Sequence, residues 1–142
     1  IIMINTNNLQ DAPIHVKFKL SALWASVMFC YIYGDFFTLF VPGRIQHLME
    51  GNCAAGDTTP AKLLLFAILM ATPPLMLFLS SILKPKINRI LNLLIGLFFT
   101  AIMALVVATS TGTWMLFYIF LGIIEITITS LIVWYAWKWP RM

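Results

Sequence analysis

Two acidic residues lie inside stretches of sequence that are otherwise almost wholly apolar. Asp35 is the single charged residue between Leu20 and Val41, and Glu125 lies in the stretch from Trp114 to Trp137. A carboxylate at membrane depth is costly, and such residues commonly serve a proton, ion or substrate pathway. Neither stretch contains a Lys, Arg or His that could pair with the carboxylate. Asp35 and Glu125 are therefore the first candidates for chemistry.

Small and polar residues surround both carboxyls at helical spacing. Tyr31 lies one helical turn before Asp35, and Tyr118 and Thr129 flank Glu125. Counted from the ends of their stretches at ~1.5 Å per residue, the depths of the two acids differ by only ~8 Å. This arrangement predicts a site for a proton, a cation or a small ligand. The alternative is structural: each carboxyl is protonated and forms a hydrogen bond across the bundle.

Two consecutive prolines, Pro73 and Pro74, interrupt the apolar stretch from Lys62 to Leu83. Because proline has no N–H, the carbonyls of Leu69 and Met70 should lack their helical partners. Free carbonyls beside carboxylates can coordinate a cation, as the broken helices of transporters do. A packed kink without a ligand is the commoner outcome of such a pair.

Other kinds of site have no support in the sequence. There is no Cys-x-x-Cys pair, no His and Cys cluster for a metal, and no glycine-rich phosphate loop. We therefore expect no metal and no cofactor. A membrane enzyme that uses the two carboxyls as acid and base stays an alternative, but nothing in the sequence demands an enzyme.

The composition places these residues in a membrane protein. The chain has 142 residues, of which 61% are hydrophobic and 10% charged, against roughly 25% charged in globular domains. A single domain over residues 1–142 is expected. The net charge of +4 does not indicate nucleic acid, because the basic residues flank the apolar stretches.

The apolar stretches predict an all-α integral membrane four-helix bundle. Spans are expected at about 20–41, 62–83, 90–109 and 114–137, each near the ~20 residues that cross a bilayer. A short amphipathic helix from Arg44 to Glu50 should lie in the outer loop between the first two spans.

The distribution of basic residues predicts the orientation of the bundle. Two basic residues fall on one side, Arg44 and Lys62, and seven on the other: Lys17, Lys19, Lys84, Lys86, Arg89, Lys138 and Arg141. By the positive-inside rule both termini should be cytoplasmic.

Three segments also resemble a known family. KLSALWASVMFCYIYGD, LKPKINR and WYAWKWP are similar to segments of a family of small bacterial four-span membrane proteins of unknown function. The resemblance implies a multi-pass protein of the bacterial inner membrane and assigns no activity. We expect a proton-, cation- or ligand-handling protein in the lipid bilayer, with a homodimer if it transports. The alternative is a scaffold or partner subunit.

Overall fold

The computed structural model describes residues 12–53 and 56–140. Four long helices make up most of it: α1 (Val16–Thr38), α3 (Pro60–Ile82), α4 (Pro85–Thr109) and α5 (Leu116–Trp137), the last preceded by the short helix η1 (Thr113–Met115). The all-α fold predicted from the sequence is confirmed. The loop after α1 holds α2 (Arg44–Met49) and a short antiparallel pairing of β1 (Asn52–Cys53) with β2 (Gly56–Asp57).

All four long helices could cross a membrane. Within the described residues, each has the length and the apolar composition of a span. Many large apolar side chains lie exposed on the outside of the bundle, among them Phe29, Leu94 and Phe120. A water-soluble surface does not expose so much apolar area, whereas contact with lipid tails requires it. The chain is a multi-pass membrane protein.

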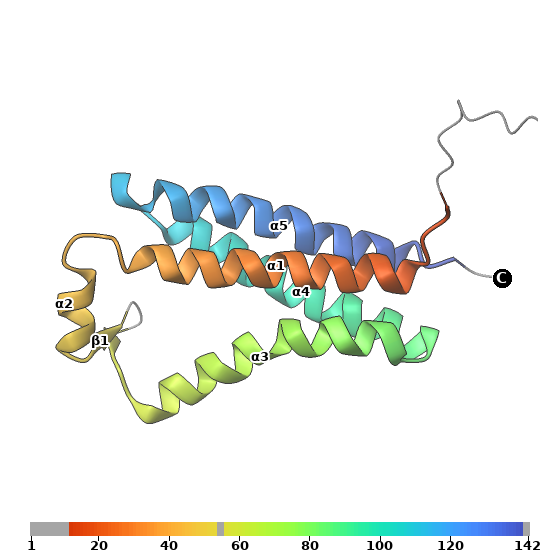
Figure 1. Ribbon diagram of the computed structural model, residues 1–142, viewed down its shortest axis with the longest axis horizontal. Helices are drawn as coiled ribbons and strands as arrows, with labels where there is room; N and C mark the ends of the chain where they lie inside the picture. Colours follow the sequence, from red (N-terminus) through yellow and green to blue (C-terminus); the bar gives the residue numbers. More distant parts are fainter. Residues whose placement is uncertain (1–11, 54–55, 141–142) are drawn as a thin grey trace, which may run out of the picture.

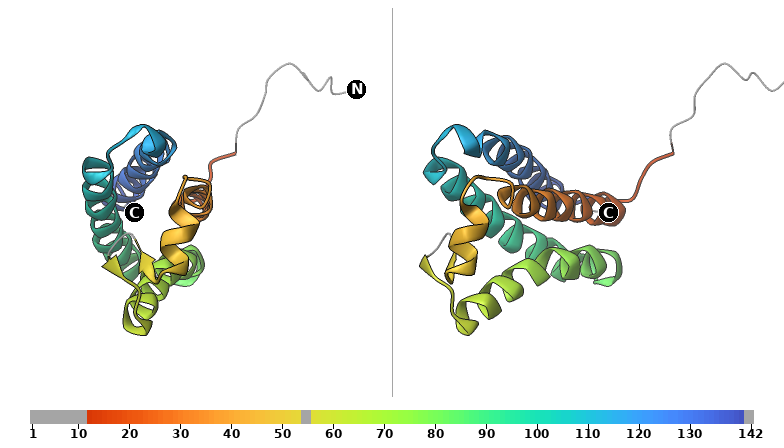
Figure 2. Two further views of the ribbon diagram at one scale, coloured as in Figure 1. Left: turned by 90° about the vertical axis from the view of Figure 1, so that its left-hand side faces the viewer. Right: turned by 60° about the vertical axis from the view of Figure 1, so that its left-hand side comes forward.

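The helices form a ring in which each packs beside its neighbours (Figures 1 and 2). The main packed pairs are α4 with α5, α5 with α1, and α1 with α3. The helices α3 and α4 are joined by a tight turn and contact each other less. The two acidic candidates, Asp35 on α1 and Glu125 on α5, are thereby carried by adjacent helices.

The helix α3 bends near its middle, and its first half leans away from the other helices (Figure 1). Pro73 and Pro74 lie inside it, and prolines are the usual cause of a sharp bend. Its buried residues, Pro73, Met76 and Ser80, all belong to the second half. Only that half of α3 is packed into the core.

A buried polar network joins α1, α3 and α4. The indole N–H of Trp24 donates to Asn92 Oδ1 at 2.7 Å, and Asn92 Nδ2 donates to Asn88 Oδ1 at 2.7 Å. Asn88 Nδ2 in turn donates to the carbonyl of Ser80 at 2.6 Å. Hydrogen bonds between spans stabilise a membrane bundle because lipid tails offer no substitute partners. This network fixes three helices at the end of the bundle where α1 begins.

Local sequence signals explain several of the helix ends. The side chain of His15 accepts from the N–H of Lys17 at 3.2 Å, so α1 begins at Val16, before the apolar stretch. Thr59 accepts from the N–H of Lys62 at 3.2 Å, with Pro60 at the start of α3. These are the caps that a side-chain acceptor and an N-terminal proline favour.

Candidate functional site

The two acidic candidates differ in their exposure. The side chain of Glu125 is 3% exposed between α5 and its neighbours, whereas Asp35 lies at the edge of the packed face of α1 with its side chain exposed. The two carboxyls are close enough for the charge of Asp35 to act on Glu125. The two acids therefore lie on adjacent helices within electrostatic reach of each other, and that they form one site stays a prediction.

Tyr118 lies where α1 and α5 touch. Its ring packs over Gly34, where an added Cβ would meet Tyr118 Cε2 at 3.6 Å. From there its hydroxyl is within electrostatic reach of both Asp35 and Glu125. The ring thus packs against Gly34 of α1 at ordinary van der Waals distance, and Tyr118 is the aromatic residue of α5 at this contact.

Tyr31 approaches the same site from the core. Its side chain is 7% exposed, and its ring centroid lies 5.9 Å from that of Phe99 on α4. Its hydroxyl is within electrostatic reach of Glu125. Cys30, the preceding residue, is half-buried and also lies within reach of Glu125.

Arg44 is a member of the site that the sequence interpretation missed. It begins α2, outside the spans, yet it is within electrostatic reach of Asp35 and Tyr118. Gly43 has φ +78°, and the N–H of Arg44 donates to the carbonyl of Val41 at 3.0 Å. This turn keeps Arg44 beside the end of α1. The sequence does indicate the turn itself, because Pro42-Gly43, a pair typical of turns, comes directly before Arg44.

Unsatisfied polar atoms are concentrated here. Among the described residues, three buried side-chain polar atoms have no hydrogen-bond partner: Tyr31 Oη, Arg44 Nε and Glu125 Oε2. All three belong to the group formed by Tyr31, Asp35, Arg44, Tyr118 and Glu125, which we call the Asp35–Glu125 cluster. Buried polar atoms are nearly always bonded, and each exception needs an explanation. A water, an ion or a ligand in the cluster would supply the missing partners.

Thr129, the remaining polar candidate, is occupied elsewhere. Its hydroxyl donates to the backbone carbonyl of Glu125 at 2.9 Å and lies 2.8 Å from the hydroxyl of Thr100 on α4. Since Thr129 gives its proton to the carbonyl, it accepts from Thr100. Its hydroxyl therefore ties α5 to α4, and the Glu125 carboxyl is not among its partners.

The carbonyl candidates lie at the bend of α3. Leu69 is half-buried against the core, and Met70 is 41% exposed. The hydroxyl of Thr72 donates to the carbonyl of Ile68 at 3.2 Å and supports the helix just before the prolines. A role of the Leu69 and Met70 carbonyls as cation ligands stays a prediction.

The chemistry open to the cluster is that of oxygen ligands and exchangeable protons. Within the described residues, no group of three or more His, Cys, Asp or Glu is arranged to hold a metal ion. The two carboxyls and two phenols can instead bind a proton, a water or a monovalent cation, and the guanidinium can donate to a water.

Four apolar helices with a polar cluster at the contact of two of them define a small multi-pass membrane protein. The chain belongs to the family of unknown function DUF6326, whose model matches residues 12–142. The resemblance to an uncharacterised family is thereby confirmed. Neither a curated protein nor a solved structure matches the chain.

Proposed function

We propose that this protein handles protons or small monovalent cations in the membrane, and that the Asp35–Glu125 cluster is the site. The observation that carries the proposal is that the three unsatisfied buried side-chain atoms of the described residues, Tyr31 Oη, Arg44 Nε and Glu125 Oε2, all belong to side chains of this cluster. They come from α1, the start of α2 and α5. A purely structural polar cluster would be expected to satisfy its own members, as the Asn88–Asn92 network does.

Charge balance suggests what the cluster takes up. With both carboxyls ionised, Asp35, Glu125 and Arg44 together carry a net charge of about −1. An unbalanced charge inside a membrane is costly. One proton or one monovalent cation makes the group neutral, whereas a divalent cation would leave a net charge of about +1. The cluster is therefore suited to exchange a single positive charge.

The setting of the site is part of the proposal. With the termini cytoplasmic in a bacterial inner membrane, the cluster lies toward the outer face. Four spans make a thin wall around a pathway, so transport would favour a homodimer. In that case the exposed carboxyl of Asp35 would face the path.

A non-catalytic partner subunit is the second candidate, and it has an observation of its own. The first half of α3 leans away from the bundle, and Leu63, Leu64 and Leu65 are each more than half exposed. A helix of another membrane protein could pack there, in which case the cluster would only fasten α1 to α5.

Liposomes loaded with a pH-sensitive dye test the proposal. A pH or cation gradient should drive proton flux through the parent protein, and Asp35→Asn and Glu125→Gln should each abolish it, because an amide releases no proton. Asp57→Asn removes an acid in β2, outside the helices, and should leave the flux unchanged. Equal flux in the parent, both amide variants and protein-free liposomes would contradict the proposal.

A further inference from the structure

A large cavity lies at the end of the bundle opposite the Asp35–Glu125 cluster. Its volume is about 1010 Å³, comparable with the larger small-molecule sites. The walls are residues 13–17 at the start of α1, Pro85, Lys86 and Arg89 of α4, and Trp139 and Pro140 after α5. Val16 and Asp35 are separated by about 28 Å along α1 at ~1.5 Å per residue. This end cavity is therefore a separate site.

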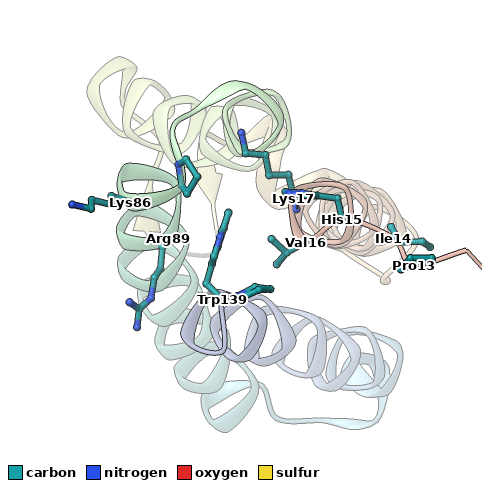
Figure 3. Close-up of a pocket in the computed structure, with 10 residues that line it drawn as sticks. Pro13, Ile14, His15, Val16, Lys17, Lys86, Arg89 and Trp139 are labelled. Atoms are coloured by element: carbon teal, nitrogen blue, oxygen red, sulfur yellow. Dashed lines mark hydrogen bonds between the residues drawn. The ribbon is translucent and has the colours of Figure 1, made fainter. Parts of the chain in front are cut away.

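The end cavity lies where spans begin and end, which is the level expected for lipid headgroups. α1 and α4 begin at it, and α5 ends beside it. Figure 3 shows Val16 and Trp139 projecting into the space between the helices. Together with Ile14 they give the cavity an apolar wall with basic residues around it. Such a lining matches an amphiphile, whose apolar part packs on the wall while its charged group meets the cations.

The basic residues at this end of the bundle are not equivalent. Nζ of Lys138 lies 4.2 Å from the ring centroid of Trp134, and Nζ of Lys19 lies 5.3 Å from that of Tyr135. These two cations rest on aromatic rings away from the cavity. Lys17, Lys86 and Arg89 line it instead.

The cations of the end cavity keep most of their donors unused. Arg89 donates through Nε to the carbonyl of Ala136 at 3.1 Å and through Nη2 to that of Trp137 at 3.4 Å. Its Nη1 has no hydrogen bond within the described residues. Within the described residues, the ammonium groups of Lys17 and Lys86 have no hydrogen bond or ion pair. Lys86 and Arg89 both point away from the space into which Val16 and Trp139 project (Figure 3), so their flexible side chains have to turn inward to meet a ligand.

No carboxylate in the described part of the chain balances this charge. Asp11 lies outside the described residues, and the other acids belong to the cluster or to the opposite loop: Asp35, Glu50, Asp57 and Glu125. Basic side chains around an unfilled cavity at the membrane surface attract anions, and phosphate is the commonest anion there.

We propose that the end cavity binds the phosphate group of an anionic amphiphile, with Lys17, Lys86 and Arg89 as its cations and Trp139 against its apolar part. The ordinary role of lysines at a span boundary is to set orientation, and that role requires no cavity. The proposal therefore predicts that the position of a lysine matters as well as its charge.

The experiment compares two double variants that remove the same charge from the same end of the bundle. Lys17→Gln with Lys86→Gln alters the cavity, and Lys84→Gln with Lys138→Gln alters only its surroundings. Native mass spectrometry measures phosphatidylglycerol retained by each purified protein, with phosphatidylcholine, which is zwitterionic and has no net charge, as the comparison. Equilibrium dialysis with inorganic phosphate measures binding of the free anion. Thermal unfolding in detergent confirms that all variants are folded.

The parent and the control double variant should retain phosphatidylglycerol. The cavity double variant should bind it roughly thirtyfold more weakly, since each basic residue contributes about fivefold in affinity. Binding of phosphatidylglycerol without inorganic phosphate identifies a lipid headgroup. Binding of inorganic phosphate with the same dependence on Lys17 and Lys86, but without retention of phosphatidylglycerol, would overturn the assignment to an amphiphile. Equal losses in both double variants, equal retention of phosphatidylcholine, or no binding of either probe would overturn the proposal.

Discussion

At the scale of single residues, two buried polar groups of the same bundle have different hydrogen-bond states. Asn88, Asn92, Ser80 and Trp24 satisfy one another at distances between 2.6 and 3.3 Å. In the Asp35–Glu125 cluster, by contrast, three buried polar atoms lack partners. The Asn88–Asn92 network therefore has the satisfied hydrogen bonds expected of a group that only stabilises the packing of the helices. The cluster has unused hydrogen-bonding groups that a water, an ion or a ligand would satisfy.

Replacing Asn92 by leucine should destabilise the bundle by about 2 kcal/mol. The change removes the bonds to Trp24 of α1 and Ser80 of α3 and the bond to Asn88 within α4. Side-chain hydrogen bonds between spans average about 0.6 kcal/mol each, and the buried Trp24 N–H left without its partner costs about 1 kcal/mol more. Unfolding by detergent titration measures the difference. Thr127→Val is the matched control, because that exposed hydroxyl bonds only to Ile123 of its own helix. Equal stability of the Asn92 and Thr127 variants would show that the network contributes nothing.

At the scale of the elements, glycine sets how closely the helices approach. An added Cβ at Gly122 of α5 would overlap Val107 of α4, and one at Gly96 of α4 would lie 2.9 Å from Val133 of α5. At Gly34 of α1 the nearest atom would be 3.6 Å away, an ordinary contact. The interface between α4 and α5 is therefore tighter at its glycines than the one between α1 and α5.

Gly122→Ala should destabilise the protein by about 1–3 kcal/mol, the usual range for overpacking. Gly34→Ala should be tolerated, since its new methyl group meets only ordinary contacts. Thermal unfolding of the two variants in detergent gives the comparison, and Val107→Ala combined with Gly122→Ala should recover the loss. An equally stable Gly122 variant, or no recovery in the double variant, would contradict the close packing.

The sequence predicted the elements better than the contacts between them. Apolar length predicted the four long helices, because the hydropathy of a span is a property of the segment itself. The sequence did not indicate that Arg44 belongs to the cluster, or that the hydroxyl of Thr129 bonds to α4. The turn at Gly43 brings Arg44 to α1, and the hydroxyl of Thr100 draws Thr129 toward α4. Both depend on residues distant in space or on a positive φ, which local periodicity does not encode.

At the scale of the whole molecule, the two proposed sites lie at opposite ends of one bundle. The Asp35–Glu125 cluster lies toward the end of α1 that carries α2, and the basic end cavity lies where α1 begins. In the proposed orientation the first is near the outer face and the second is at the cytoplasmic face. Under the two proposals, charge has two roles along the same axis: an exchange site at one end and an anion site at the other.

The orientation itself can be measured with reporter fusions. Reporters after Met142 and between Leu83 and Ile90 should report the cytoplasm, because the basic residues gather on that side. A reporter near Cys53 should report the outside. An outside signal at either of the first two positions would overturn the orientation. The Asp35–Glu125 cluster would then lie toward the cytoplasmic face of the membrane and the end cavity at the outer face.

The central claim is that Asp35 and Glu125 form one site, and proton release from the purified protein across about pH 5 to 9 tests it most directly. The parent is compared with Asp35→Asn, Glu125→Gln, the double variant, and Asp57→Asn as a control away from the cluster. If the carboxyls share a site, removing either one changes the titration of the other, so the single-variant differences do not add up to that of the double variant. Strictly additive differences, or no titration attributable to either acid, would contradict the account.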